Sequence, residues 1–256
     1  MNITKLYTII LTMTLGTGLG FFNTDSQAQQ YEIGLGLGGA SYTGDIIRRI
    51  DPTQVGIQGT LFGRRNFDNA WSLRAGLSAA RLNATDSLRP IDPVALSRNA
   101  HFNGTLLEAA AIMEFHFLDY LSHQSPTRLS PFGYLGLGYA MFFGNGQAYE
   151  GDPFAGRYNV NTALIPFGLG IKYKLKDRLF LSLEGGIKAT FSDNLDKISN
   201  DPTYLPRFKN DPDTGNQVLD PSSLNYGNPY DRDWYYFLGL TLSYSFHQVK
   251  CYNYNN

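Results

Sequence analysis

Side chains alternate between apolar and polar along eight segments of this chain, and this alternation limits the possible folds more than any other feature. The segments are residues 31–39, 55–64, 71–84, 104–118, 131–142, 162–175, 178–191 and 234–246. A period of two places successive side chains on opposite faces of a β-sheet. Eight is an even number, so strands of this kind can close into a small antiparallel barrel.

One face of the predicted strands is apolar, whereas the other mixes glycine, hydroxyl and charged side chains. Segment 131–142 carries Leu135, Leu137 and Tyr139 on its apolar face, and segment 71–84 carries Arg74 and Ser78 on its polar face. A membrane barrel turns the apolar face outward, whereas a soluble barrel or sandwich turns it inward. The alternation alone is compatible with both arrangements.

Three further observations favour the membrane arrangement. The segments reach about 10–14 residues, and a tilted transmembrane strand needs about 9–11. Aromatic residues, including Trp71, Phe142, Phe180, Trp234 and Phe246, lie towards segment ends, where interfacial girdles form. Shorter connections at 66–70, 119–130 and 176–177 alternate with longer ones at 40–54, 85–103, 144–161 and 192–233. We therefore predict an all-β fold, an eight-stranded antiparallel up-and-down transmembrane β-barrel with long outer loops and short periplasmic turns, embedded in outer-membrane lipids.

An eight-stranded barrel has an interior narrow enough for side chains to fill, so we expect a filled lumen and no pore. Several charged residues fall on the predicted inner face. We interpret them as a packed ionic network, and a path for protons or ions is the functional alternative. The residues are Arg74, Glu108, Glu114, Glu184 and Lys188.

Both ends of the chain differ from the predicted barrel. Lys5 precedes an apolar run at 6–22, and Ser-Gln-Ala ends at Ala28, a pattern typical of a cleaved secretory signal. We expect a signal peptide at 1–28, the barrel at 29–246 and a periplasmic tail at 247–256. After the signal no window offers the roughly 20 consecutive apolar residues of a helical span. Both termini of the mature barrel are then periplasmic, with an even strand count.

Composition and motifs argue against several classes of function. The net charge of −1 does not favour a nucleic-acid partner. The glycines of 34–39 lie within a strand, where no dinucleotide is held, and the Asp-rich segments around 192–216 depart from the spacing of a calcium loop. His101, His116 and His123 show no pairing with a serine that would make a nucleophilic site. We expect no enzyme activity, cofactor or metal.

In the predicted periplasmic turns and tail basic residues outnumber acidic ones, whereas the outer loops are richer in acidic residues. A basic rim of this kind attracts inner-leaflet phosphates or an acidic protein partner, although a solvated face without a specific role has the same composition. The candidate residues for contact with a periplasmic partner are Arg64, Arg65, Phe67, Arg128, Lys174, Lys176, Arg178, Lys250 and Cys251.

Several segments together resemble the PorG family of outer-membrane barrels of the Bacteroidetes type IX secretion system. They are the Tyr-x-Gly-Asp segment at 42–45, the turn at 67–74, the Pro-Phe-Gly-x-Gly-x-Lys-Tyr strand at 166–173 and the segment 190–198. The resemblance implies a non-enzymatic component that docks or anchors a periplasmic ring of the PorK and PorN type. It also implies a role in protein secretion and, in gliding species, in motility. The alternative is a surface-binding or adhesin-type barrel that acts through its outer loops.

The chain has one cysteine, Cys251, in the predicted tail, so an internal disulfide is excluded. An unpaired cysteine in an oxidising compartment indicates intermolecular pairing or a tolerated free thiol. Five extended residues beyond Phe246 reach at most about 17 Å. We therefore expect Cys251 to reach a partner at the inner leaflet, with an intermolecular disulfide as the hypothesis and a passive tail as the alternative.

Overall fold

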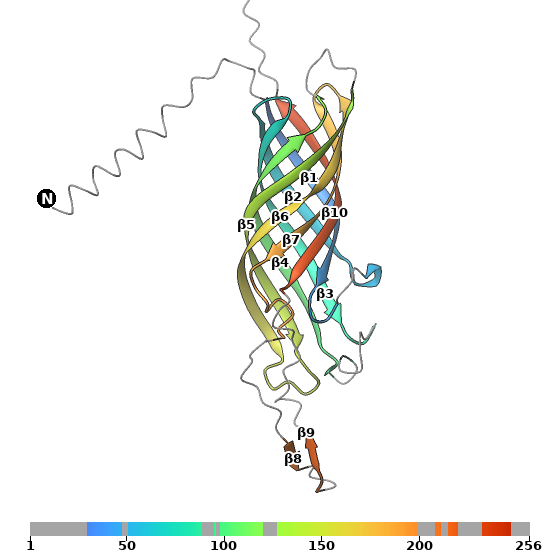
Figure 1. Cartoon of the computed structure of the whole chain (residues 1–256), viewed down its shortest axis with the longest axis vertical. Coiled ribbons are helices and arrows are strands. Elements are labelled where there is room, and N and C mark those ends of the chain that lie inside the picture. Colours follow the sequence, from blue (N-terminus) through green and yellow to red (C-terminus); the bar gives the residue numbers. More distant parts are fainter. Residues whose placement is uncertain are drawn as a thin grey trace, which may run out of the picture. The chain divides into compact units, whose positions relative to one another are not determined.

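Eight long strands form a closed antiparallel barrel in the computed structural model of the chain (Figure 1). The structure describes residues 30–47, 51–88, 95, 98–119, 127–198, 208–210, 215–219 and 232–246. The barrel strands are β1 Gln30–Thr43, β2 Gly56–Asn66, β3 Trp71–Thr85, β4 His101–His116, β5 Leu129–Gln147, β6 Gly156–Lys176, β7 Leu179–Thr190 and β10 Trp234–Phe246. The predicted eight-stranded barrel is thereby confirmed.

Each barrel strand pairs with its neighbour in the chain, and β10 closes the sheet by pairing with β1 and β7. Closure leaves no unpaired strand edge, so every strand satisfies its backbone groups on both sides. A separate hairpin pairs β8 Phe208–Asn210 with β9 Gln217–Leu219, and a 3-10 helix, η1, spans Pro52–Gln54. Among the described residues, no helix is long and apolar enough to cross a membrane.

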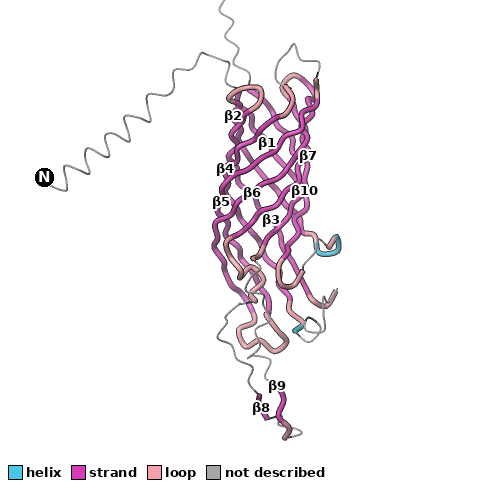
Figure 2. The backbone as a smooth tube through the Cα atoms, in the orientation of Figure 1, coloured by secondary structure: helices cyan, strands magenta, loops and turns pink. Residues whose placement is uncertain are grey.

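The two ends of the barrel differ in their connections, as Figure 2 shows. At one end, which we call the terminal end, the start of β1 pairs with the end of β10, and the connections are 67–70, 117–128 and 177–178. The first of these is a tight turn in which Asp68 accepts hydrogen bonds from the backbone of Ala70 and Trp71. The opposite end, the loop end, carries connections 44–55, 86–100, 148–155 and 191–233.

Strands β5 and β6 are longer than their sequences predicted, with 19 and 21 residues. The expected loop at 144–161 therefore shortens to 148–155. Glycine and asparagine at 144–146 are poor strand formers, so the pattern places a turn there. In the barrel these residues pair directly with β6, as Asn145 does with Arg157, and this pairing overrides local propensity.

The barrel has an apolar exterior and a polar interior. Leu37 and Ile57 face outward with exposed fractions of 72% and 76%, whereas Glu114 and Lys172 are fully buried inside. This polarity is the reverse of that in a soluble sheet protein. It confirms the predicted outward orientation of the apolar faces.

Two aromatic residues expected in the interfacial girdles lie inside the barrel. Phe142 and Phe180 are each 1% exposed, whereas Trp71 and Phe246 face outward as predicted. Position near a strand end does not determine which face of the sheet a side chain occupies, and this is the physical reason for the difference. Phe142 lies two residues from buried Ala140, on the same face of β5, and its side chain helps to fill the lumen.

Candidate functional surfaces

A chain of buried ion pairs crosses the lumen near the terminal end. Glu32 of β1 binds Arg64 of β2 at 2.7 Å and Lys172 of β6 at 2.8 Å. Arg64 Nε in turn lies 2.7 Å from Glu114 of β4. Asn66 and Ser243 donate further hydrogen bonds to Glu32, at 2.8 and 2.9 Å. These contacts satisfy charges that would be very unfavourable if they were buried alone.

The same chain of contacts continues to the far wall through Arg74 of β3. Arg74 lies 2.9 Å from Glu114 and 2.6 Å from Glu184 of β7. Thr241 of β10 donates to the other oxygen of Glu184 at 3.0 Å. The network therefore connects side chains from seven of the eight barrel strands.

A second group lies further along the lumen, where Lys188 and the Tyr235 hydroxyl each bind Glu108 at 2.6 Å. Together the two groups contain four cations and four carboxylates, so their positive and negative charges balance. The cations are Arg64, Arg74, Lys172 and Lys188, and the carboxylates are Glu32, Glu108, Glu114 and Glu184. A cavity of about 50 Å³ remains between them, bordered by Thr60, Arg74 and Gly36 among others. This volume accommodates a few water molecules and no larger solute, so the lumen is filled.

The five residues predicted on the inner face, Arg74, Glu108, Glu114, Glu184 and Lys188, all lie in the lumen and take part in these contacts. Sequence reasoning missed their partners Glu32, Arg64 and Lys172. The alternation along each strand could have identified two of them as inward-facing. Glu32 directly precedes outward Ile33, and Lys172 lies between outward Ile171 and Tyr173.

Arg64 corrects an expectation about the periplasmic rim. The predicted strand ends at Arg64, which places this residue at a periplasmic turn, yet β2 continues to Asn66 and Arg64 is buried in the lumen. Arg64 lies two residues after inward Phe62 and therefore on the same face of β2, so its guanidinium joins the ionic network. Arg64 is therefore not available to a partner at the barrel surface.

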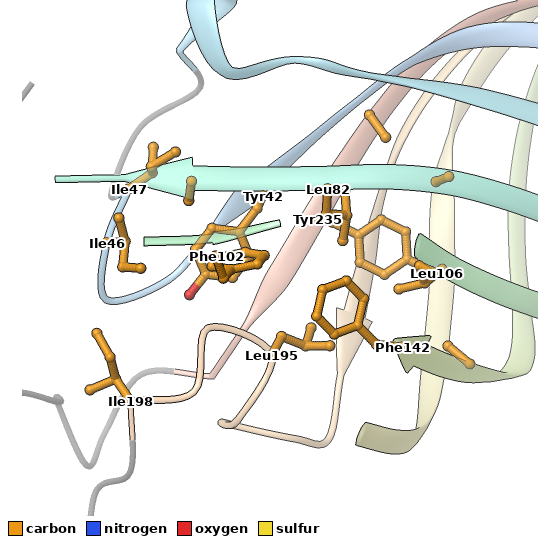
Figure 3. Close-up of a cluster of buried hydrophobic side chains, with 14 of the residues drawn as sticks. Tyr42, Ile46, Ile47, Leu82, Phe102, Leu106, Phe142, Leu195, Ile198 and Tyr235 are labelled. Atoms are coloured by element: carbon orange, nitrogen blue, oxygen red, sulfur yellow. The ribbon is translucent and has the colours of Figure 1, made fainter. Parts of the chain in front are cut away.

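An apolar cluster fills the barrel at the loop end (Figure 3). The ring of Phe102 packs against Tyr42 at a centroid distance of 4.9 Å and against Phe142 at 5.8 Å. Leu195, from the connection after β7, is completely buried among them, and the Tyr158 hydroxyl donates to its carbonyl oxygen at 2.5 Å. Segment 192–198 therefore folds over the mouth of the barrel.

Two buried carboxyl groups hold this segment in place. Asp196 and Asp233 both approach the Tyr42 hydroxyl, at 2.7 and 2.5 Å. Asp233 also accepts a hydrogen bond from Leu195 N at 2.7 Å, and Asp196 accepts one from Ile198 N at 2.9 Å. We call this arrangement the Tyr42 latch; it comprises Tyr42, Asp196 and Asp233.

The Tyr42 latch requires a bound proton. A phenol has a single hydrogen, so it can donate to one carboxylate only, and the second carboxyl must itself donate. Burial raises the pKa of Asp233 to about 7. Burial and the nearby charges of Asp233 and Asp45 also raise the pKa of Asp196 well above its ordinary value. The closed latch is therefore a shared-proton arrangement.

The terminal end presents most of the remaining residues predicted to contact a partner. Arg65 lies over the rings of Phe67 and Tyr31, with centroid distances of 5.3 and 5.9 Å. Lys174 approaches Asp177 at 3.8 Å. Arg128, Lys176 and Arg178 are exposed on the rim, whereas Lys250 and Cys251 lie outside the described residues.

The histidines do not form a nucleophilic site in the described part of the chain. His101 begins β4 and is exposed, whereas His116 is buried 3.6 Å from Glu114. His123, Asp201, Asp211 and Asp213 lie outside the described residues. Within those residues, no group of three or more metal-ligating side chains is found.

A closed eight-stranded barrel with an apolar exterior and a filled, charged lumen defines the class of membrane-spanning β-barrels. Residues 10–255 match the family described as Domain of unknown function (DUF6089), and the chain belongs to this family. A comparison with curated proteins gives no match.

The fold is similar to solved small barrels at low sequence identity. A major outer membrane protein of Thermus thermophilus is 16% identical with a TM-score of 0.46, and the match covers 86% of this chain and 100% of that one. Ail, the attachment invasion locus protein of Yersinia pestis, is 12% identical with a TM-score of 0.44 and the same coverages. The outer membrane protease OmpT of Escherichia coli is 11% identical with a TM-score of 0.34, covering 89% and 99%.

Proposed function

We propose that this chain is a non-enzymatic outer-membrane barrel that docks or anchors a periplasmic assembly of the type IX secretion system, a ring of the PorK and PorN type. The observation that carries the proposal is the filled lumen. With the ionic network at one end and the apolar cluster at the other, a solute has no route through the barrel. The function therefore resides on the surfaces of the barrel.

The terminal end is the surface that best suits an acidic protein partner. Among the described residues on this rim, cations outnumber carboxylates by five to three. The cations are Arg65, Arg128, Lys174, Lys176 and Arg178, and the carboxylates are Asp68, Asp119 and Asp177. Two of the carboxylates already have partners, because Asn69 donates to Asp119 at 3.0 Å and Lys174 approaches Asp177. An excess of exposed positive charge speeds encounter with an acidic surface.

The proposed orientation places the terminal end in the periplasm and the loop end outside the cell. The short connections 67–70 and 177–178 at the terminal end support it, because periplasmic turns of such barrels are short. The sequence resemblance to PorG-like barrels supports a ring of the PorK and PorN type as the partner. In gliding species the same docking role supports motility.

Charge reversal on the rim tests the proposal. We expect Arg128→Glu, Lys176→Glu and Arg178→Glu together to abolish co-purification of the periplasmic ring and to impair secretion, because like charges would then face the partner. Arg232→Glu is the matched control, since Arg232 is exposed at the loop end, over the ring of Phe191. Heat-modifiable migration on gels shows that each variant is folded.

The rival function, a surface-binding barrel, makes the opposite prediction. If the triple variant keeps its partners and its secretion, while shortening the loop-end connection 199–231 abolishes function, the docking proposal is wrong. Mass spectrometry of proteins captured with the wild-type barrel from solubilised envelopes identifies the partner independently.

A further inference from the structure

On the outer wall formed by β3, β4, β5 and β6, the outward side chains change from apolar to polar towards the loop end. On β4 the outward side chains from Phe115 to Leu107 are apolar, and the next two towards the loop end are Thr105 and Asn103. The adjoining strands change in the same way, and strand register joins their polar residues into one row. The row is Asn83, Asn103, Asn145 and Arg157.

The change on β4 corresponds to the boundary of a bilayer. Eight residue steps from Phe115 to Leu107 extend about 26 Å along the strand, or about 19 Å along the membrane normal at a tilt near 45°. The outward apolar band of a membrane barrel is about 25 Å tall. Asn103 and its neighbours therefore lie where headgroups replace acyl chains.

The polar row borders a groove of about 750 Å³ on this wall. Arg81 enters from one side and Arg157 from the other, while Phe143 lies between them. No carboxylate lines the groove, and neither arginine pairs with a carboxylate among the described residues. The two guanidinium groups and several amides form a surface suited to phosphate and hydroxyl groups.

A second groove, apolar and of about 730 Å³, crosses β2, β3 and β4 and lies nearer the terminal end. Its lining includes the small side chains Ala75, Ala109 and Ala111, together with Leu61 and Leu77. Small residues leave a depression on the membrane-facing wall. A depression of this kind accommodates an acyl chain on the terminal-end side of the polar groove.

The opposite wall lacks this arrangement. In the described residues of β1, β2, β7 and β10, no lysine or arginine faces outward in the loop-end half. Arg232 is exposed, directly precedes β10 and lies 5.7 Å from the centroid of the Phe191 ring. The cationic groove is therefore confined to one side of the barrel.

We propose that the groove between Arg81 and Arg157 binds a phosphorylated glycolipid of the outer leaflet. The two guanidinium groups bind phosphate, Asn83, Asn103 and Asn145 hydrogen-bond to sugar hydroxyls, and an acyl chain lies in the apolar groove. The ends of the polar row are three strand spacings apart, about 14 Å, which suits a headgroup larger than a single phosphate. This proposal uses the same orientation as the proposed function but is independent of secretion.

Lipid binding to the purified full chain in detergent tests the proposal, with bis-phosphorylated lipid A, its dephosphorylated form and phosphatidylglycerol as probes. Native mass spectrometry or fluorescence titration measures the affinity. We expect Arg81→Gln with Arg157→Gln to weaken lipid A binding by about tenfold or more, because two charge-assisted contacts are lost. Removal of the phosphates should have a similar effect on the wild type, and Arg232→Gln should have none.

Two results would overturn the proposal: unchanged lipid A binding by the double variant, or phosphatidylglycerol binding as tightly as lipid A. Asn103→Leu with Asn145→Leu is a second variant that leaves the charge unchanged, and it should also weaken lipid A binding. Heat-modifiable migration again confirms folding of each variant.

A labelling experiment separates this proposal from the docking proposal. Asn159→Cys, in a Cys251→Ser background, should react with a membrane-impermeant maleimide on intact cells if the loop end is outside. Labelling only after permeabilisation would contradict the orientation that both proposals use. Labelling of intact cells combined with unchanged lipid binding by the double variant would overturn the glycolipid site alone.

Discussion

The Tyr42 hydroxyl lies 2.5 Å from Oδ1 of Asp233, although the two residues are 191 positions apart in the sequence. This contact joins the first barrel strand to the residue that precedes the last one, and Asp196 completes it from the connection between them. The Tyr42 latch therefore fastens segment 192–198 over the mouth only when the chain has closed into a barrel.

The latch should respond to pH. Burial raises the pKa of Asp233 from its ordinary value of 3.8 to about 7 in the closed state. A raised folded-state pKa means that the stabilisation is complete below about pH 3.8, falls as the pH rises towards about 7, and stays lost above that. We expect hydrogen exchange of segment 192–198, corrected for intrinsic rates, to accelerate between about pH 4 and about pH 7 and then to level off.

Replacing one carboxyl by an amide should remove this dependence. In Asp233→Asn the side-chain oxygen accepts from Leu195 N, and its NH2 group donates to Tyr42, whose hydroxyl then donates to Asp196. We expect segment 192–198 to stay protected at pH 8 in this variant. Tyr42→Phe is the contrasting variant and should lower protection at every pH, by about 1–3 kcal/mol. Equal pH dependence in wild type and Asp233→Asn would contradict the shared-proton interpretation.

Neighbouring arginines at the end of β2 should differ strongly in their effect on stability. Arg64→Ala leaves Glu32 and Glu114 buried without one of their partners, and we expect the free energy of unfolding to fall by about 3–5 kcal/mol. Arg65→Ala removes a partly exposed side chain stacked on Phe67, and should change it by less than about 1 kcal/mol. Urea titration in lipid vesicles measures both, and similar losses in both variants would refute the assignment of Arg64 to the lumen.

Glycines on the two faces of the barrel should tolerate alanine differently. A Cβ on Gly168 would collide with the Tyr134 hydroxyl and with the backbone oxygen of Gly185. We expect Gly168→Ala to destabilise the barrel by about 1–3 kcal/mol. A Cβ on outward-facing Gly63 has as its nearest neighbour the Glu32 backbone oxygen at 4.0 Å, so Gly63→Ala should be nearly neutral. Thermal shifts in gel migration compare the two variants.

The tail carries a prediction from the sequence alone, because residues 247–256 lie outside the described ones. If Cys251 forms an intermolecular disulfide, non-reducing gels of intact cells should show a higher-mass band that Cys251→Ser lacks. A pattern identical in both strains would exclude the covalent contact and leave the passive tail.

Alternation along the chain was sufficient to predict the barrel, its strand number and its outward apolar faces, because a period of two is a local property of each strand. It was also sufficient to place Arg74, Glu108, Glu114, Glu184 and Lys188 on the inner face. It was insufficient at strand ends, where glycine and asparagine at 144–146 indicated a turn and cross-strand pairing extended β5 instead. The same boundary error placed Arg64 on the rim.

Only the tertiary structure decided which inward charges meet. Glu32 and Lys172 are 140 residues apart, and their contact depends on the register of all the strands between them once the sheet has closed. The Tyr42 latch and the polar groove of β3 to β6 have the same origin, since each collects residues from strands or loops that are distant in sequence. Local periodicity determines which face a side chain occupies, whereas closure and register determine its partner.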